Sequence, residues 1–175
     1  EVAVFEVDHP ASQAYKLKKV VSKQHHAKTL AHVAVDFGKD RLSDRLQAAG
    51  YDPSQPSCWV WEGVTMYLPH AATAATLAEI AALSVGGRQL AMTYVIPQLF
   101  GGGRGGWLVR KVFGAIDEPL IGGMAPAEVR ALLRERGFTV MADGSNWDWA
   151  RQIGQGGAAW ATLFRSERLV FAARK

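Results

Sequence analysis

Hydrophobic and polar positions along the chain follow two periods, and their succession predicts strands separated by helices. Short β-branched and aromatic runs predict strands over residues 2–8, 30–38, 58–63, 88–99, 139–143 and 168–174. Apolar residues at helical spacing predict helices over residues 11–24, 39–50, 70–87 and 125–138. Pro10 and Pro126 suit helix starts, while Gly50 and Gly137 suit helix ends.

This order of elements predicts the α/β class, with a doubly wound and mostly parallel sheet. Between the last two strands, residues 144–164 predict a loop with a short helix and no full crossover. We therefore expect the last strand to run antiparallel. The chain has no internal repeat and no low-complexity linker, so we expect a single domain over residues 1–175.

Three successive predicted strands end in an acidic residue, and these are Asp8, Asp36 and Glu62. In open α/β sheets, ligands bind beyond the carboxyl ends of parallel strands. The three carboxylates therefore predict a polar ligand site at that edge. Glu6 shares a strand face with Asp8, because side chains alternate along a strand, and it is interpreted as a partly buried structural acid. His9 either touches a ligand or caps the following helix.

The amino-acid composition and net charge limit the kinds of molecule that the chain is expected to bind. The chain is 49% hydrophobic and 21% charged, with a net charge of +4, and its basic residues are scattered. We expect no nucleic-acid partner from so modest and dispersed an excess. No apolar run approaches the length of a membrane span, and the first residues do not resemble a signal peptide. The sequence therefore predicts a cytoplasmic protein without a membrane partner.

The cysteine and histidine residues are too few and too scattered along the sequence to predict a metal-binding site. Cys58 is the single cysteine, and its apolar surroundings "CWVW" predict a buried structural thiol. His25 and His26 sit in a polar connection and His32 in a strand, with no second cluster at ligand spacing. We expect no metal site.

Four segments carry a family resemblance. "VFEVDHPASQAYK", "VAVDF" and "WEGVTMYLP" occur in this order, followed by "DEPLIGGMAPAEVRALLRERGF". Together they resemble the leucine carboxyl methyltransferase and polyketide O-methyltransferase-like family, and within it the bacterial S-adenosylmethionine-dependent methyltransferases. The resemblance implies a class I methyltransferase fold, which is Rossmann-like and has an antiparallel last strand, and S-adenosyl-L-methionine as cofactor.

The resemblance also implies roles for particular residues. Asp8 would hold the ribose hydroxyls, Asp36 and Phe37 would lie beside the adenine, and Glu62 would lie beneath the methionine or ribose portion. Tyr67 follows in a loop, where its hydroxyl either orients a substrate or packs in an ordinary way. The implied reaction is methyl transfer to the oxygen of a carboxylate or of a small-molecule hydroxyl. The sequence assigns no catalytic base.

The chain departs from the family upstream of "EVDHP", where the family has a first strand and a glycine-rich loop. Nothing precedes Glu1 here, so we expect the chain to lack that N-terminal segment. The alternative to an enzyme is a non-catalytic remnant of the fold that acts, if at all, through self-association as a homo-oligomer.

Two late features leave alternatives open. "GGGRGG" at residues 101–106 contains GxGxxG, but no acid closes a following strand. A flexible loop or lid hinge is preferred over a dinucleotide site, and a nicotinamide-dependent enzyme is disfavoured. Four tryptophans in the late loops either line an apolar acceptor pocket or fill gaps in the core: Trp107, Trp147, Trp149 and Trp160.

Overall fold

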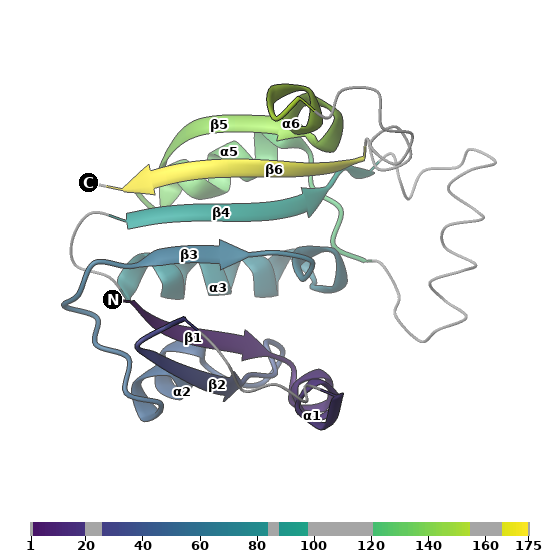
Figure 1. The fold of residues 1–175 in the computed structure, drawn as a ribbon. Coiled ribbons are helices and arrows are strands. Elements are labelled where there is room, and N and C mark those ends of the chain that lie inside the picture. The colour runs from purple at the N-terminus through teal and green to yellow at the C-terminus, as the bar shows by residue number, and fades with distance from the viewer. Residues whose placement is uncertain (1, 20–25, 84–87, 98–120, 155–165, 175) are drawn as a thin grey trace. The chain divides into compact units, whose positions relative to one another are not determined.

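The computed structural model describes residues 2–19, 26–83, 88–97, 121–154 and 166–174 (Figure 1). The chain divides into two compact units, Glu1–Ser54 and Gln55–Lys175. The expectation of a single domain stays a prediction. No helix within the described ranges is long and apolar enough to cross a membrane.

The first unit is built on two parallel strands. Its elements are β1 (Ala3–Asp8), α1 (Pro10–Lys19), β2 (Thr29–Ala34) and α2 (Leu42–Ala48). In the ladder, Ala3 lies opposite Thr29 and Asp8 lies opposite Ala34. The core of the unit gathers aliphatic side chains from β2, from the residue that follows its end and from α2, which are Val33, Val35, Leu42 and Leu46. Phe5 meets Tyr51 edge to face, with ring centroids 5.5 Å apart.

The second unit contains a mixed four-stranded sheet. Its strands are β3 (Cys58–Trp61), β4 (Arg88–Val95), β5 (Thr139–Ser145) and β6 (Glu167–Arg174), in the order β3-β4-β6-β5. β3 and β4 pair in parallel, whereas β6 runs antiparallel to both β4 and β5. The predicted antiparallel last strand is confirmed. An antiparallel neighbour needs no long crossover helix, and among the described residues between β5 and β6 the one helix is the short α6 (Asn146–Gln152).

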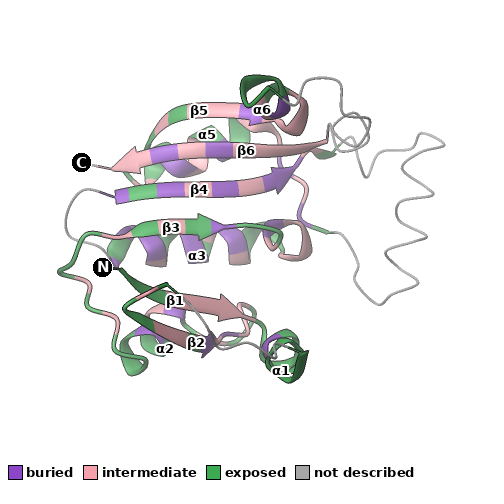
Figure 2. Cartoon of the chain, in the orientation of Figure 1, coloured by how far each residue is buried: buried purple, intermediate pink, exposed green. Residues whose placement is uncertain are grey.

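Helices cover one face of this sheet. The remaining elements are η1 (Thr65–Tyr67), α3 (His70–Ala82), α5 (Pro126–Glu135) and α6 (Asn146–Gln152). Figure 1 shows α3 and α5 behind the sheet. Burial alternates along β4, so that Leu90 and Met92 are fully buried while Gln89 is exposed (Figure 2). Arg88 donates to the Ala81 carbonyl oxygen of α3 at 2.5 Å, so the buried face of β4 is the one under the helices.

The predicted elements recur with shifted boundaries. β2 ends at Ala34 and β3 ends at Trp61, so Asp36 and Glu62 lie on the turns that follow these strands. Helix ends agree better, because Gly50 and Gly137 have φ values of 88° and 79°, which favour glycine. Residues 20–24 of the first expected helix, residues 84–87 of the third and "GGGRGG" lie outside the described residues.

The prediction for Cys58 was wrong, because its side chain is exposed. Cys58 pairs with Gln89, which belongs to the uncovered face of β4. Apolar neighbours in sequence predicted burial, but alternation along β3 sends Trp61 under the helices and Cys58 to the opposite face.

A buried carboxylate joins four elements of the second unit. Asp143 of β5 is 6% exposed, and its Oδ1 accepts hydrogen bonds from Tyr94 of β4 at 2.8 Å and from Arg168 of β6 at 3.0 Å. Its Oδ2 accepts one from Arg130 of α5 at 2.9 Å. Burial and the neighbouring Asp143 carboxylate raise the pKa of Tyr94, so this hydroxyl stays protonated and donates.

We expect Asp143→Ala to destabilise the chain strongly, by about 3–5 kcal/mol, because the change leaves the Arg168 cation without its anion. Glu135→Ala is the matched control. Glu135 is 66% exposed and pairs with Arg136 at 3.5 Å, so its loss should cost about 1 kcal/mol or less. Urea denaturation followed by circular dichroism measures both. Equal midpoints for the two variants would contradict a supporting role for the Asp143 cluster.

Candidate functional site

Two of the predicted site residues, Asp8 and Asp36, lie at the same edge of the β1–β2 ladder. β1 ends at Asp8, and the Val35 amide donates to the Asp8 carbonyl oxygen at 2.9 Å. Asp36 is the next residue after Val35. Parallel pairing therefore brings both acids to the carboxyl ends of adjacent strands, where ligands of α/β sheets bind.

Asp8 retains capacity to accept further hydrogen bonds. One carboxylate oxygen, Oδ1, accepts the amide of His9 at 2.7 Å. His9 in turn accepts the amide of Ala11 through Nδ1 at 3.3 Å, which confirms its local capping role at the start of α1. Within the described parts of the chain, the second oxygen of Asp8 has no hydrogen-bond partner, so it can accept from a ligand hydroxyl.

Asp36 is held in a turn of its own making. Its Oδ1 accepts the amide of Gly38 at 3.0 Å, and its Oδ2 pairs with Lys39 at 2.9 Å. The Lys39 ammonium, followed by the Gly38 amide, holds the pKa of Asp36 below its ordinary value. Asp40 accepts the Asp36 amide at 2.9 Å and closes the same turn. Phe37 follows Asp36 in the sequence, and its side chain is half-buried.

Glu6 behaves as the partly buried structural acid that the sequence predicted. Its side chain is 29% exposed and pairs with Lys16 of α1 at 2.5 Å. The ring of His32, its partner in the ladder, lies 3.8 Å away. Glu6 therefore ties α1 to the sheet and is distinct from Asp8 in role.

Glu62 and Tyr67 belong to the second unit. Glu62 is exposed and follows β3, just before Gly63, whose φ is 70°. The Gly63 amide donates to Thr93 Oγ1 at 2.9 Å, which fixes the turn that carries Glu62 against β4. Tyr67 is half-buried in η1. That Glu62 converges with Asp8 and Asp36 on one ligand stays a prediction.

The segment Ile121–Met124 locks η1 in place. The amides of Ile121 and Gly122 both donate to the Met66 carbonyl oxygen at 2.9 Å, and the amide of Met124 donates to Val95 at 2.9 Å. A Cβ on Gly122 would lie 2.0 Å from the Thr65 carbonyl oxygen. Only glycine permits this approach, which gives a physical reason for "IGGM" in the fourth resemblance segment.

A hollow of about 360 Å³ lies on the uncovered face of the four-stranded sheet, against α6. We call it the α6 pocket. Its lining includes Val60, Glu62, Trp149, Ile153, Glu167 and Leu169. Trp149 therefore does line a pocket, Trp147 is not among its lining residues, and Trp107 and Trp160 lie outside the described residues.

Sequence reasoning named Trp149 as a possible pocket residue, but it missed Asn146, Ile153 and the contribution of β6. The signal that could have found them is "SNWD", a capping box that starts a helix. Ser145 and Asp148 form that box, with the Ser145 amide donating to Asp148 at 2.8 Å. The Ser145 hydroxyl, which donates to Asp148 Oδ2 at 2.6 Å, and after it the Ser145 amide lower the pKa of Asp148. The box fixes the start of α6 and hence the position of Trp149.

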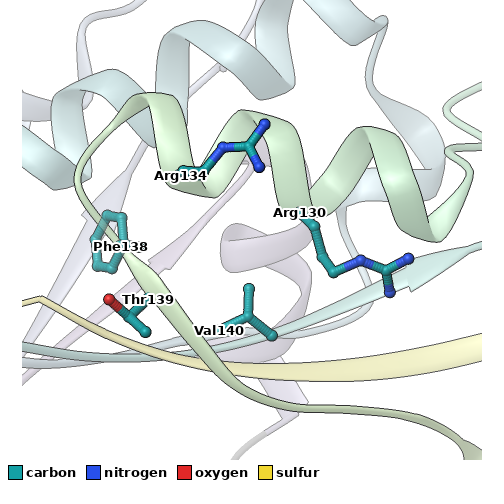
Figure 3. Close-up of a pocket in the computed structure, with 5 residues that line it drawn as sticks. All are labelled: Arg130, Arg134, Phe138, Thr139 and Val140. Carbon is teal, nitrogen blue, oxygen red and sulfur yellow. The ribbon is translucent and has the colours of Figure 1, made fainter.

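A second hollow, of about 260 Å³, lies between α5 and β5. Figure 3 shows Arg130 and Arg134 one turn apart on α5, above Phe138, Thr139 and Val140. Arg130 is engaged with Asp143 at 2.9 Å. No group of three or more residues suited to a metal ion gathers among the described residues.

Comparison with solved structures defines the class of the fold. The chain resembles an S-adenosylmethionine-dependent methyltransferase from Mesorhizobium loti, with a TM-score of 0.65 at 14% identity over 99% of this chain and 80% of that one. Because the sequence identity is only 14%, this similarity is evidence for the fold alone. The fold is the Rossmann-like class I methyltransferase fold, as predicted.

Comparison with known sequences confirms the family resemblance. Residues 1–81 match the family described as leucine carboxyl methyltransferase. The chain is 37% identical to a "Putative S-adenosyl-L-methionine-dependent methyltransferase" of Rhodococcus jostii, over 65% of this chain and 40% of that protein. The chain is also 34% identical to a protein of Mycolicibacterium smegmatis with the same description, over 65% of this chain and 39% of that protein. The aligned part of the chain thus spans about two fifths of these relatives.

The turn around Asp36 predicts a pH dependence. A carboxyl whose pKa is lowered in the folded state gives stabilisation that is present above its ordinary value of 3.8 and is lost as the pH falls through the folded pKa. We expect Asp36 to titrate below 3.8 in carboxyl-carbon NMR. In Lys39→Met the midpoint should rise, because the largest cause of the shift is gone. An unchanged midpoint in that variant would show that Lys39 does not hold the carboxylate.

We expect Gly122→Ala to lower stability by about 1–3 kcal/mol or more, because its Cβ would overlap backbone atoms that cannot rotate away. Gly38→Ala is the control, since its Cβ would meet only the Asp36 side chain, at 3.3 Å. Urea denaturation of both variants measures the difference. If Gly122→Ala unfolds at the wild-type midpoint, the tight packing of Ile121–Met124 on η1 is wrong.

Proposed function

We propose that the chain forms part of an S-adenosyl-L-methionine-dependent methyltransferase that methylates an oxygen atom, either of a carboxylate or of a small-molecule hydroxyl. The observation that carries the proposal is the parallel β1–β2 ladder, which places Asp8 and Asp36 at one carboxyl edge. The family match over residues 1–81 covers the same strands. The names of the similar proteins support the same cofactor.

The residues present fit the nucleoside portion of such a cofactor. The free oxygen of Asp8 is an acceptor suited to a ribose hydroxyl, and a carboxylate can take two vicinal hydroxyls together. Asp36 and Phe37 offer an acceptor and an aromatic surface for the adenine. Lys39 already occupies one oxygen of Asp36, so adenine binding would have to share or displace that ion pair.

The second unit would supply the remaining groups. Glu62 is an exposed carboxylate whose charge complements the cationic ammonium and sulfonium groups of the cofactor. Tyr67 would orient the reacting group of the acceptor through its hydroxyl from η1, outside the residues that line the α6 pocket. Its position depends on η1, which the Ile121–Met124 segment holds by hydrogen bonds.

When bound, the cofactor supplies an electrophilic methyl group for in-line displacement. The protein then has to align the acceptor oxygen with that methyl group and exclude water, and alignment is the larger part of the task. A carboxylate acceptor carries no proton to remove, whereas a hydroxyl acceptor requires a general base. The proposal assigns no residue as that base.

Isothermal titration with S-adenosylhomocysteine tests the proposal on the 175-residue chain. We expect saturable binding to the wild type and a roughly tenfold or greater loss in Asp8→Ala, because hydrogen bonds to a charged group contribute about 1.5–3 kcal/mol. Asp44→Ala is the matched control, since Asp44 is an exposed acid of α2 in the same unit. Its affinity should equal that of the wild type.

Two results would count against the proposal. Equal losses in Asp8→Ala and Asp44→Ala would remove Asp8 from the site. Absence of binding to the folded wild-type chain would favour the alternative, a non-catalytic chain of the same fold that self-associates. Sedimentation of the same sample would then be expected to show homo-oligomers.

A further inference from the structure

The α6 pocket lies on the sheet face that α3 and α5 leave uncovered. Ala91 and Thr93 of β4 line its floor, and they alternate with the buried residues Leu90 and Met92. Leu169 of β6 lies opposite Thr93 in the ladder and continues the floor. The short helix α6 provides a wall. The pocket thus belongs entirely to the second unit.

The walls of the pocket are apolar and open to solvent. Val60 is 72% exposed and Ile153 is 71% exposed, the two highest values among the exposed large hydrophobic residues of the described chain. Both line this one hollow. The Trp149 ring also lines it, and its Nε1 donates to the carbonyl oxygens of Gly144 and Leu169 at 3.2 Å each. A fixed aromatic ring beside exposed aliphatic groups is typical of a small-molecule pocket.

The charged side chains that line the pocket are all negative. Glu62 and Glu167 line it, and no lysine, arginine or histidine is among its lining residues. Asn146 donates to one oxygen of Glu167 at 2.8 Å, which orients that carboxylate. Glu62 has no hydrogen bond or ion pair within the residues that the structure describes. The two carboxylates attract hydrogen-bond donors and cations, and they repel anions.

We propose that the α6 pocket binds the methyl acceptor, and that this acceptor is a neutral or cationic small molecule with an apolar body and a hydroxyl or ammonium group. This inference rests on the proposed function, and it deepens it by choosing between the two acceptor classes. In the cofactor-free chain a carboxylate ligand would place a third negative charge beside Glu62 and Glu167. With the cofactor bound, its cationic groups would offset the charge of Glu62, and Glu167 would remain as the repelling charge. The pocket therefore selects against carboxylates.

Three probes with the same hydroxyphenyl body test the charge preference. Tyramine ends in an ammonium group, tyrosol in a hydroxyl and desaminotyrosine in a carboxylate. Each is titrated into the 175-residue chain by calorimetry, with the indole N–H resonance of Trp149, assigned by loss in Trp149→Phe, as the local readout. We expect tyramine and tyrosol to shift this resonance saturably, and desaminotyrosine to bind roughly tenfold more weakly or not at all.

A variant that removes one charge tests whether the pocket carboxylates cause the preference among the probes. Glu167→Gln keeps the size of the side chain and removes one negative charge, so the preference for tyramine over desaminotyrosine should fall severalfold. Glu135→Gln is the matched control, because Glu135 is exposed on α5 and does not line the pocket. Its preference should equal that of the wild type. Circular dichroism of both variants shows whether the fold is retained.

The outcomes separate this inference from the proposed function. Binding of S-adenosylhomocysteine without binding of tyramine or tyrosol would overturn the acceptor pocket alone. Binding of tyramine without S-adenosylhomocysteine would support the pocket and count against the cofactor. Equal affinity for all three probes, or tightest binding of desaminotyrosine, would overturn the charge selection. An unchanged preference in a folded Glu167→Gln variant would do the same.

Discussion

The second unit depends on one buried carboxylate. Asp143 receives hydrogen bonds from β4, β6 and α5 at once, and it lies on β5. A buried carboxylate is tolerated only with partners that replace its hydration, so the positions of Tyr94, Arg168 and Arg130 are mutually constrained. This constraint fixes the pairing register of the antiparallel strand β6 with its neighbours β4 and β5. It also fixes one helix against the same face of the sheet.

The other face of that sheet carries the α6 pocket. Because α3 and α5 take the buried side chains of β4, the alternate residues are free to form the floor of the α6 pocket. The capping box of Ser145 and Asp148 then determines where α6 begins and where Trp149 lies. The pocket is thus a consequence of strand alternation and of one local capping motif.

The two units contribute different chemistry to the proposed enzyme. The first offers acceptor oxygens at a sheet edge, which suit the hydroxyls and amino group of a nucleoside. The second offers an apolar hollow with two carboxylates, which suits an acceptor that donates hydrogen bonds. The family name refers to carboxyl methylation, whereas the charges of the hollow favour an acceptor without a carboxylate. The relative affinity of the chain for ligands with and without a carboxylate is therefore the informative measurement.

The sequence by itself determined the succession of elements, the antiparallel last strand, the helix-ending glycines and the family resemblance. These features depend on local periodicity, on backbone conformations that suit glycine, and on contiguous motifs. It also indicated that Glu6 is a partly buried structural acid, because Glu6 lies within the strand and shares a face with Asp8 at the strand end. Only the tertiary structure decided that Cys58 is exposed, that Asp36 and Glu62 lie beyond their strands, and that Asn146 and Glu167 line a pocket with Glu62. These facts depend on which face each strand buries and on contacts between residues far apart in the chain, and no local pattern encodes either.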